Sequence, residues 1–410
     1  MSGFIAFLFL LMVPALTRAD SLSLEAAIAL AEARTPDVAA LSAGVAAAQA
    51  AVRPAGRLPD PQLLLGVENL PVSGPERWSL TRESMTMRKV GLMQALPNGA
   101  RRRAEADVAR AAAERVLAEQ HLRTLEIRRD TALAWLERYY LERRGALLDE
   151  LQRENGLLTA AVDARLSAGG AMPADALGPR VEAVDLADRR DELDAALEQA
   201  RAALRRWVGA ASDVSLAGEP RDYPLDTVRL RAHVHEHPEL AVYTPATALA
   251  QAEVHAAEAA RRPDWGVELS YGKRAAAFGD MVSLQVTMGL PLFAGARQEP
   301  AIEVRRQALV RVEAERAVML LEHQRDLEVD LAGYHALTRQ LERLRTLRLP
   351  LARQAVDYQL ASYRAGRGEL RGVLQARREL IETRLRELEL EAARAAAAAK
   401  LHYIYGEGAR

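Results

Sequence analysis

The chain changes twice from one hydrophobic period to another, and this change constrains the fold more than any other feature. The stretch "GLMQALPNGARRRAEADVARAAAERV" begins at Gly91 as the end of an alternating strand and then becomes an Ala-, Arg- and Glu-rich helix pattern. From Val286, "VTMGLPLFAGARQEPAIEVRRQALVRVEAER" repeats the change. Period two belongs to strands and period 3.6 to helices. The sequence therefore predicts two short strands that each lead straight into a long helix.

The predicted helices are unusually long. No proline lies between Arg101 and about Ser167, so at about 1.5 Å per residue this stretch predicts a rod on the order of 100 Å long. Pro350 lies inside a later helix and is expected to kink or break it. Frequent alanines let such helices approach closely along a shared seam. The full set of predicted helices covers about 101–167, 174–208, 298–363 and 369–405.

Two pairs of short segments alternate as strands do. The clearest runs from Trp265 to Tyr271, with an apolar residue at every second position, whereas Arg88-Lys89 interrupts the alternation of the second strand in the first half. A tilted membrane-spanning strand requires about nine to eleven such residues, but a half-buried soluble hairpin alternates in the same way. Two features favour the membrane interpretation: the other face of each strand is polar, and the N-terminus resembles a secretory leader, as described below. The predicted strands cover about 61–70, 85–96, 264–272 and 281–291.

The two halves of the chain resemble each other. The spacing from Gly169 to Gly366 equals the spacing from Gly209 to Gly406. Such self-similarity indicates an internal repeat. Each half reads as helix, strand, strand, long helix, turn and helix. We therefore expect three parts: a signal peptide over 1–19, a first repeat over 20–215 and a second repeat over 216–410.

The N-terminal stretch "MSGFIAFLFLLMVPALTRAD" has the features of a secretory leader. Its apolar run from Phe4 to Leu16 is too short to span a bilayer, and a small-residue site ends at Ala19. The sequence predicts cleavage after Ala19 and export from the cytoplasm.

Composition excludes several classes of function. The chain has no cysteine and a formal net charge of −1, so disulfides, thiolate metal sites and a basic surface for nucleic acid are excluded. Zinc-protease, serine-hydrolase and phosphate-loop signatures do not occur in the sequence. We expect neither an enzyme nor a resident cofactor.

Four strands are too few to close a barrel by themselves. An open sheet edge in lipid leaves backbone N–H and C=O groups unsatisfied. If these strands lie in a membrane, the chain must therefore oligomerise, and two, three or four copies would each supply enough strands for closure.

These residues resemble a known family. The leader, the duplicated unit and the turn with Tyr363, Gly366 and Val373-Leu374 look like the TolC-like outer-membrane efflux proteins. More narrowly, "DPQLLLGVENLP" and "SMTMRKVGLMQALPNGARRRAEAD" are similar to the branch that serves heavy-metal resistance-nodulation-division exporters. The resemblance implies a homotrimer with a twelve-stranded β-barrel in outer-membrane lipid, continuous with a twelve-helix periplasmic α-barrel. It also implies two partners, a periplasmic adaptor and an inner-membrane exporter.

The same resemblance assigns roles to the two helix–helix turns. Small residues there would form the periplasmic tip that docks an adaptor, although glycines also end helices for purely structural reasons. Some family members carry pore aspartates just past the second turn, where this chain has Gly372 and Gln375; Asp175 and Glu369 are the nearest replacements. The implied docking residues are Ala168, Gly169, Gly170, Ala365, Gly366 and Gly368.

Two clusters allow a metal interpretation. "HVHEH" places His233, His235 and His237 at alternate positions, and in a helix the first and third would share a face that can bind zinc or copper. The same stretch also reads as a helix end before a proline. Met85, Met87 and Met93 are soft ligands, but methionine in a strand more often packs against neighbours.

The preferred interpretation is a mostly α-helical outer-membrane duct of a tripartite efflux pump, exporting heavy-metal cations. The alternative is a secreted or periplasmic coiled-coil scaffold without a pore. Conductance across a planar bilayer separates a duct from a scaffold.

Overall fold

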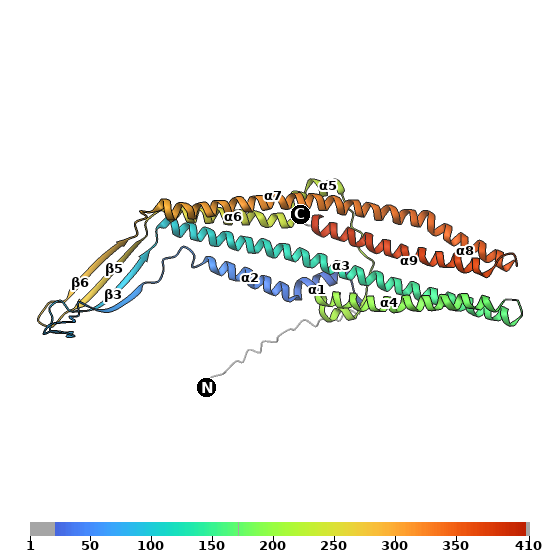
Figure 1. The fold of residues 1–410 in the computed structure, drawn as a ribbon, viewed down its shortest axis with the longest axis horizontal. Coiled ribbons are helices and arrows are strands. Elements are labelled where there is room, and N and C mark those ends of the chain that lie inside the picture. Colours follow the sequence, from blue (N-terminus) through green and yellow to red (C-terminus); the bar gives the residue numbers. More distant parts are fainter. Residues whose placement is uncertain (1–20, 171, 407–410) are drawn as a thin grey trace, which may run out of the picture. The chain divides into compact units, whose positions relative to one another are not determined.

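The computed structural model describes residues 21–170 and 172–406, so the predicted signal peptide over 1–19 lies outside the described residues. Within them the chain is mostly helical with a small β part, which confirms the predicted fold class (Figure 1). The chain forms two compact units. Of the described residues, one contains 21–35, Ile127–Pro224 and Gly333–Lys400; the other contains Pro36–Glu126, Leu225–Ala332 and 401–406. We call them the helical unit and the sheet unit.

The sheet unit contains a four-stranded antiparallel sheet in the order β2-β3-β5-β6. β3 leads into α3, and β6 leads into α7 (Figure 1), as the change of period predicts. Its other elements are the helices α2, α5 and α6. The bounds are α2 (Pro36–Val52), β2 (Gln62–Glu68), β3 (Met87–Leu96), α3 (Gly99–Ser167, continuing into the helical unit), α5 (Thr227–Ala232), α6 (Pro238–Ala259), β5 (Trp265–Lys273), β6 (Met281–Met288) and α7 (Ala294–Arg343, likewise continuing).

The register places like residues opposite each other. Leu92 of β3 pairs with Leu269 of β5, which pairs with Leu284 of β6. Because side chains alternate between faces, this register gathers most of the apolar residues on one face, which also carries Arg88, Gln94 and Lys273.

β3 is continuous through Arg88 and Lys89, although these residues interrupt its alternation and Arg88 lies opposite Val67 on the apolar face. The Lys89 Nζ lies 2.8 Å from a carboxylate oxygen of Glu68 and 2.7 Å from one of Glu268. Glutamates from the two neighbouring strands therefore compensate the lysine charge on the polar face, so the strand continues.

A polar junction holds the point where β3 becomes α3. The Asp264 carboxylate accepts hydrogen bonds from the backbone N–H of Asn98 at 2.8 Å and from its side-chain amide at 2.9 Å, and it pairs with Arg101 at 2.7 Å. The Asn98 side-chain oxygen in turn accepts from the Arg101 N–H at 2.8 Å and caps the helix. Burial raises the pKa of Asp264, but these bonds from Asn98 and Arg101 outweigh it and leave the pKa below its ordinary value.

Replacing Asp264 with alanine should destabilise this junction, because two Asn98 donors and Arg101 lose their acceptor. We expect a loss of about 1–3 kcal/mol in unfolding free energy. Chemical denaturation of the purified protein measures it. The matched control is Asp60→Ala, since Asp60 also follows a proline before a strand but is exposed. Equal stability of the two variants would contradict the role given to Asp264.

The helical unit is held by leucine packing between helices. Leu148 and Leu151 of α3 pack with Leu186 and Leu193 of α4 and with Leu385 of α9 in one buried cluster. The spacing of these leucines by three, four or seven residues is that of a helix seam. The bounds here are β1 (Ser21–Leu22), α1 (Leu24–Arg34), α4 (Leu177–Val208), β4 (Ser215–Leu216), α8 (Leu349–Arg364) and α9 (Leu370–Leu401).

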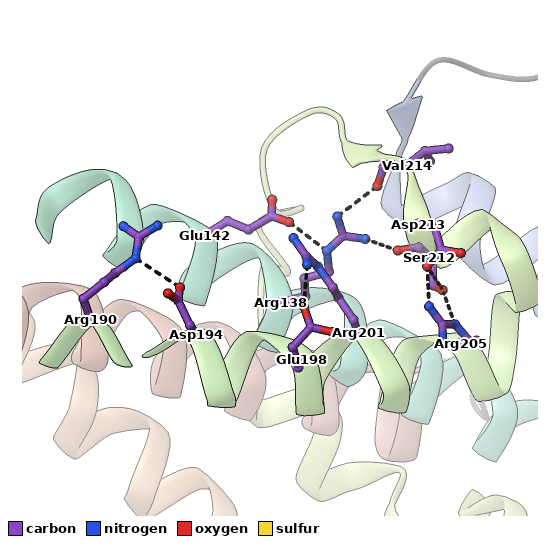
Figure 2. Close-up of polar contacts among 10 residues, drawn as sticks. All are labelled: Arg138, Glu142, Arg190, Asp194, Glu198, Arg201, Arg205, Ser212, Asp213 and Val214. Carbon is purple, nitrogen blue, oxygen red and sulfur yellow. Dashed lines mark hydrogen bonds and ion pairs between the residues drawn. The ribbon is translucent and has the colours of Figure 1, made fainter. Parts of the chain in front are cut away.

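A buried arginine fixes the segment after α4. Arg138 is only 3% exposed, and its guanidinium donates to the carbonyl oxygens of Ser212 at 2.7 Å and Val214 at 2.9 Å and to Glu142 at 2.7 Å (Figure 2). The short parallel pair β1–β4 begins directly after Val214. Since a buried charge without partners is costly, these three bonds explain why an arginine is tolerated in the interior.

Pro350 is expected to kink or break its helix, and the structure has a local change of helix type just before it. The chain forms a π-helical turn at Leu344–Arg348, and the Leu349 N–H donates to the Leu344 carbonyl five residues earlier. Proline lacks an N–H and its ring crowds the carbonyl four residues before it, so a wider turn accommodates it. α8 then continues to Arg364.

Candidate functional site

One face of the four-stranded sheet is apolar and exposed. Leu65 is 73% exposed, Leu284 69% and Val286 57%. In water such a contiguous apolar surface is unfavourable, whereas on a barrel it is the face that contacts lipid. The register also places Arg88, Gln94 and Lys273 on this face. Its apolar residues are Leu63, Leu65, Val67, Val90, Leu92, Leu96, Trp265, Val267, Leu269, Tyr271, Val282, Leu284, Val286 and Met288.

The opposite face carries polar and small residues. Glu268 pairs in register with Gln285, and Ser270 with Ser283. Ser270 is buried at 4% exposure and faces Gly91, where an added Cβ would lie 2.8 Å from the Ser270 Cβ. Ser283 on the neighbouring strand is exposed. The polar face therefore has room for larger side chains on β6 but little at Ser270.

A pair of adjacent residues on β6 tests which face meets lipid. Leu284→Arg should reduce recovery of assembled protein from the outer-membrane fraction, because a charge at mid-membrane depth costs about 2–4 kcal/mol. Ser283→Arg should assemble normally and change the conductance of the reconstituted protein. Quantitative blotting of membrane fractions measures recovery. If the two variants assembled to the same extent, the assignment of the faces would be wrong.

The two helix–helix turns have the same backbone geometry. After α3, the Gly170 N–H donates to the Arg165 carbonyl at 2.8 Å and the Gly169 N–H to the Leu166 carbonyl at 3.0 Å. After α8, the equivalent bonds run from Arg367 and from Gly366 at 3.0 and 3.1 Å. This is the Schellman pattern, which needs a left-handed residue, and Gly169 and Gly366 have φ of +71° and +70°.

The turns contact each other within the helical unit. The Arg165 guanidinium lies over the Tyr363 ring, 4.4 Å from its centroid. Below them Val162, Leu370 and Val373 belong to one buried apolar cluster. The side chains beneath the turns are thus fixed.

The predicted tip residues lie together at these turns, and most are exposed. A Cβ added to Gly169 or Gly366 would meet no atom within 4 Å, whereas one at Gly368 would lie 3.0 Å from Ser362. Gly368 therefore has a packing role of its own. Exposed positions among the predicted docking residues are Ala168, Gly169, Gly170, Ala365 and Gly366.

The two predicted pore carboxylates have different surroundings. An Asp175 carboxylate oxygen accepts a hydrogen bond from the Met172 N–H at 2.9 Å, which caps the short 3₁₀ turn Pro173–Ala176 before α4. Glu369 is exposed immediately before α9. Only Glu369 is thus presented to solvent without a local capping role, and a pore function for either residue stays a prediction.

The three histidines of "HVHEH" do not share a helix face. α5 ends at Ala232, a 3₁₀ turn covers Val234–Glu236 and α6 begins at Pro238, so the segment is a break between helices. His235 is exposed, while His237 is buried at 4% exposure. The proline after His237 favours this break, because it disfavours helical geometry at the residue before it.

Sequence spacing did not point to the actual neighbours of His237. Its ring stacks on that of His323 from α7, with centroids 3.5 Å apart, and Glu239 lies within the same group. Burial, followed by the nearby His323, lowers the pKa of His237 to about 4, although Glu239 opposes the shift. His237 is therefore neutral at neutral pH.

The methionines are separated along their strand. Met87 and Met93 lie on the polar face of β3, six positions apart, which corresponds to about 20 Å. That distance is too long for both sulfur atoms to bind one ion within this chain. Met85 precedes the strand.

Residues 232–407 match the family model described as "Outer membrane efflux protein". The second half of the chain is therefore similar to the outer membrane efflux proteins. Solved structures share its fold along nearly the whole chain. A membrane protein from Pseudomonas aeruginosa is 19% identical, with a TM-score of 0.81 over 95% of this chain and 90% of that one. The channel protein CusC is 18% identical, with a TM-score of 0.79 over 93% and 92% of the two chains.

The outer membrane protein VceC from Vibrio cholerae is 17% identical, with a TM-score of 0.77 over 93% of this chain and 96% of that one. Comparison with curated proteins finds no match. The match over residues 232–407 agrees with the prediction of an outer-membrane efflux conduit rather than an enzyme. In the described ranges, 21–170 and 172–406, none of the helices has the length and apolarity that crossing a membrane requires.

Proposed function

We propose that the protein is the homotrimeric exit duct of a tripartite efflux pump. The observation that carries the proposal is the open four-stranded sheet with one exposed apolar face. β2 and β6 form its edges and each has a single partner strand within the chain. Three copies joined edge to edge would give a closed twelve-stranded barrel, the number that the family resemblance implies. Closure would satisfy every edge hydrogen bond and leave the apolar face toward lipid.

This arrangement also favours a duct over a coiled-coil scaffold. A water-soluble scaffold would have to cover Leu65, Leu284 and Val286, which the chain itself leaves exposed. A lipid surface covers them without any further partner. The polar face, with Glu268 and Gln285, would then line an aqueous lumen.

The helix–helix turns support a second part of the proposal, docking of a periplasmic adaptor that connects the duct to an inner-membrane resistance-nodulation-division exporter. Gly169 and Gly366 are exposed, lack any atom near a Cβ position and lie on a rigid base of buried apolar residues. Such a surface admits the backbone of another protein at close range. The energy for transport would come from the inner-membrane partner, since the sequence has no nucleotide-binding signature.

Bulk at this surface should uncouple the pump without unfolding the duct. In Gly366→Trp, the side chain enters open space, so trimer yield should be maintained while export and cross-linking to the adaptor are lost. Gly366→Ala is the matched control: it carries most of the cost of a left-handed residue, roughly 1 kcal/mol, and little of the bulk. Export assays and adaptor cross-linking measure the difference. Full export by the tryptophan variant at normal trimer levels would remove Gly366 from the docking surface.

Heavy-metal cations are the proposed cargo. The support comes from the segments around Asp60–Pro71 and Ser84–Asp107, which resemble the heavy-metal branch of the family. In the folded chain these segments include β2, β3 and the junction residue Asn98. They thus form the barrel and its connection to α3, which is the part of the duct through which cargo leaves.

Deletion of the gene should sensitise the cell to one or more transition-metal cations, and the wild-type chain should restore tolerance. The growth-inhibiting concentrations of Cu²⁺, Zn²⁺, Co²⁺ and Ni²⁺ and of a panel of organic drugs provide the measurement. Sensitivity to drugs alone would leave the duct in place and reject the metal cargo. The Gly366→Trp variant should fail to restore tolerance, which assigns the phenotype to transport.

A further inference from the structure

A buried group of two histidines and a glutamate lies in the sheet unit, outside the four strands of the sheet. His237 directly precedes α6, Glu239 is in the first turn of α6, and His323 comes from α7. One ligand atom from each of the three lies within 4.8 Å of the other two. Among residues 21–170 and 172–406, it is the one group of three histidine or acidic side chains close enough together to hold a metal ion.

Both imidazoles leave a buried nitrogen without a hydrogen bond. His237 is 4% and His323 8% exposed, and the Nε2 atom of each is buried without a hydrogen-bond partner. A carboxylate oxygen of Glu239 lies 3.1 Å from the His323 Nε2, close enough for an ion pair with a protonated imidazole, but the two atoms form no hydrogen bond. Buried polar atoms normally have partners, so two orphaned nitrogens in one group call for a physical reason.

We propose that His237, Glu239 and His323 form a site for a divalent transition-metal cation, with Zn²⁺ as the fitting ion. Two imidazoles and one carboxylate are the protein ligands of an open tetrahedral zinc site, in which the fourth position belongs to water. The same donors suit Cu²⁺ and Ni²⁺ less specifically. A bound cation would give both orphaned nitrogens a partner.

The geometry requires only side-chain movement. Bonds of about 2.0–2.1 Å in a tetrahedron separate neighbouring ligand atoms by roughly 3.3 Å, so a group within 4.8 Å contracts by about 1.5 Å at most. Nitrogen lone pairs lie in the ring plane, and the two rings are nearly parallel at 23°, so one ring has to turn about its side-chain torsions. The Tyr405 ring, edge-on to His237 at 5.2 Å, forms one wall of the site.

The metal would also act on the start of α6. The Glu239 N–H donates to the His237 Nδ1 at 3.1 Å, so His237 caps this helix and carries the ring proton of its neutral form on Nε2. A cation at Nε2 requires the other neutral tautomer, in which the ring proton has moved to Nδ1. Nδ1 then no longer accepts from the Glu239 N–H, so a metal–nitrogen bond replaces the cap hydrogen bond. The ion would thereby connect the start of α6 to α7. The two histidine ligands, His237 and His323, are 86 positions apart in the sequence.

This site is separate from the proposed cargo. A cation held by three ligands in a buried group is a resident ion. The experiment that tests this site therefore measures metal binding to the purified chain, not export. Failure of the site would leave the proposed duct unchanged, and failure of metal export would leave the site unchanged.

Titration of the purified, chelator-stripped full chain with Zn²⁺ tests the proposal. We expect one saturable site per chain by calorimetry, and Co²⁺ in its place should give the intense visible absorption of tetrahedral coordination. His323→Gln and Glu239→Gln should each weaken binding by roughly tenfold or more. His237→Asn removes the ligand but keeps a side-chain oxygen that can cap α6, so it separates metal binding from capping.

The matched control is His235→Asn, since His235 is exposed and outside the group. Helical content and oligomer mass of every variant should equal those of the wild type. Absence of saturable Zn²⁺ binding by the wild-type chain would overturn the proposal, as would full affinity in His323→Gln. Equal loss of binding in His235→Asn would assign the ion to the exposed "HVHEH" run and overturn it as well.

Discussion

The open edges of one small sheet constrain the rest of this protein. β2 and β6 each pair with one strand, and the outer face that they bound is apolar and exposed. Backbone groups at such edges cannot be left unsatisfied in lipid, so strands that lie in a membrane require edge-to-edge closure with other copies. Glu68, Lys89 and Glu268 compensate one another on the polar side of the sheet, which permits charge on the face that would meet water.

The same chain must pass from that sheet into a helix without a flexible linker. Asn98 and Arg101 share the Asp264 carboxylate, so the end of β3, the start of α3 and the start of β5 meet at one polar junction. At the other ends of the long helices, two Schellman turns with glycines at φ near +70° reverse the chain over a buried apolar cluster. A membrane conduit that reaches across an aqueous space needs both devices, one rigid junction and one exposed tip.

Local sequence patterns predicted the helices and strands well. They failed to predict contacts between residues that are distant in sequence. Alternation and the absence of proline predicted β5, β6 and α3, because side-chain period is a local property. The sequence could not show what compensates the charge of Lys89 within its strand, because Glu268 is far away in sequence. In the same way the spacing of "HVHEH" suggested His233 as the neighbour of His237, whereas the fold supplies His323. The turn glycines could be predicted from the sequence because a left-handed backbone conformation favours glycine over other residues.

The mass of the detergent-extracted complex tests most directly whether copies of this chain close one sheet into a transmembrane duct. Light scattering combined with refractive-index and absorbance detection separates the protein mass from the detergent. Three chains in one particle, recovered from the outer-membrane fraction, is the expected result. A stable monomer that stays in aqueous solution without detergent would contradict the closure of the sheet and, with it, the duct.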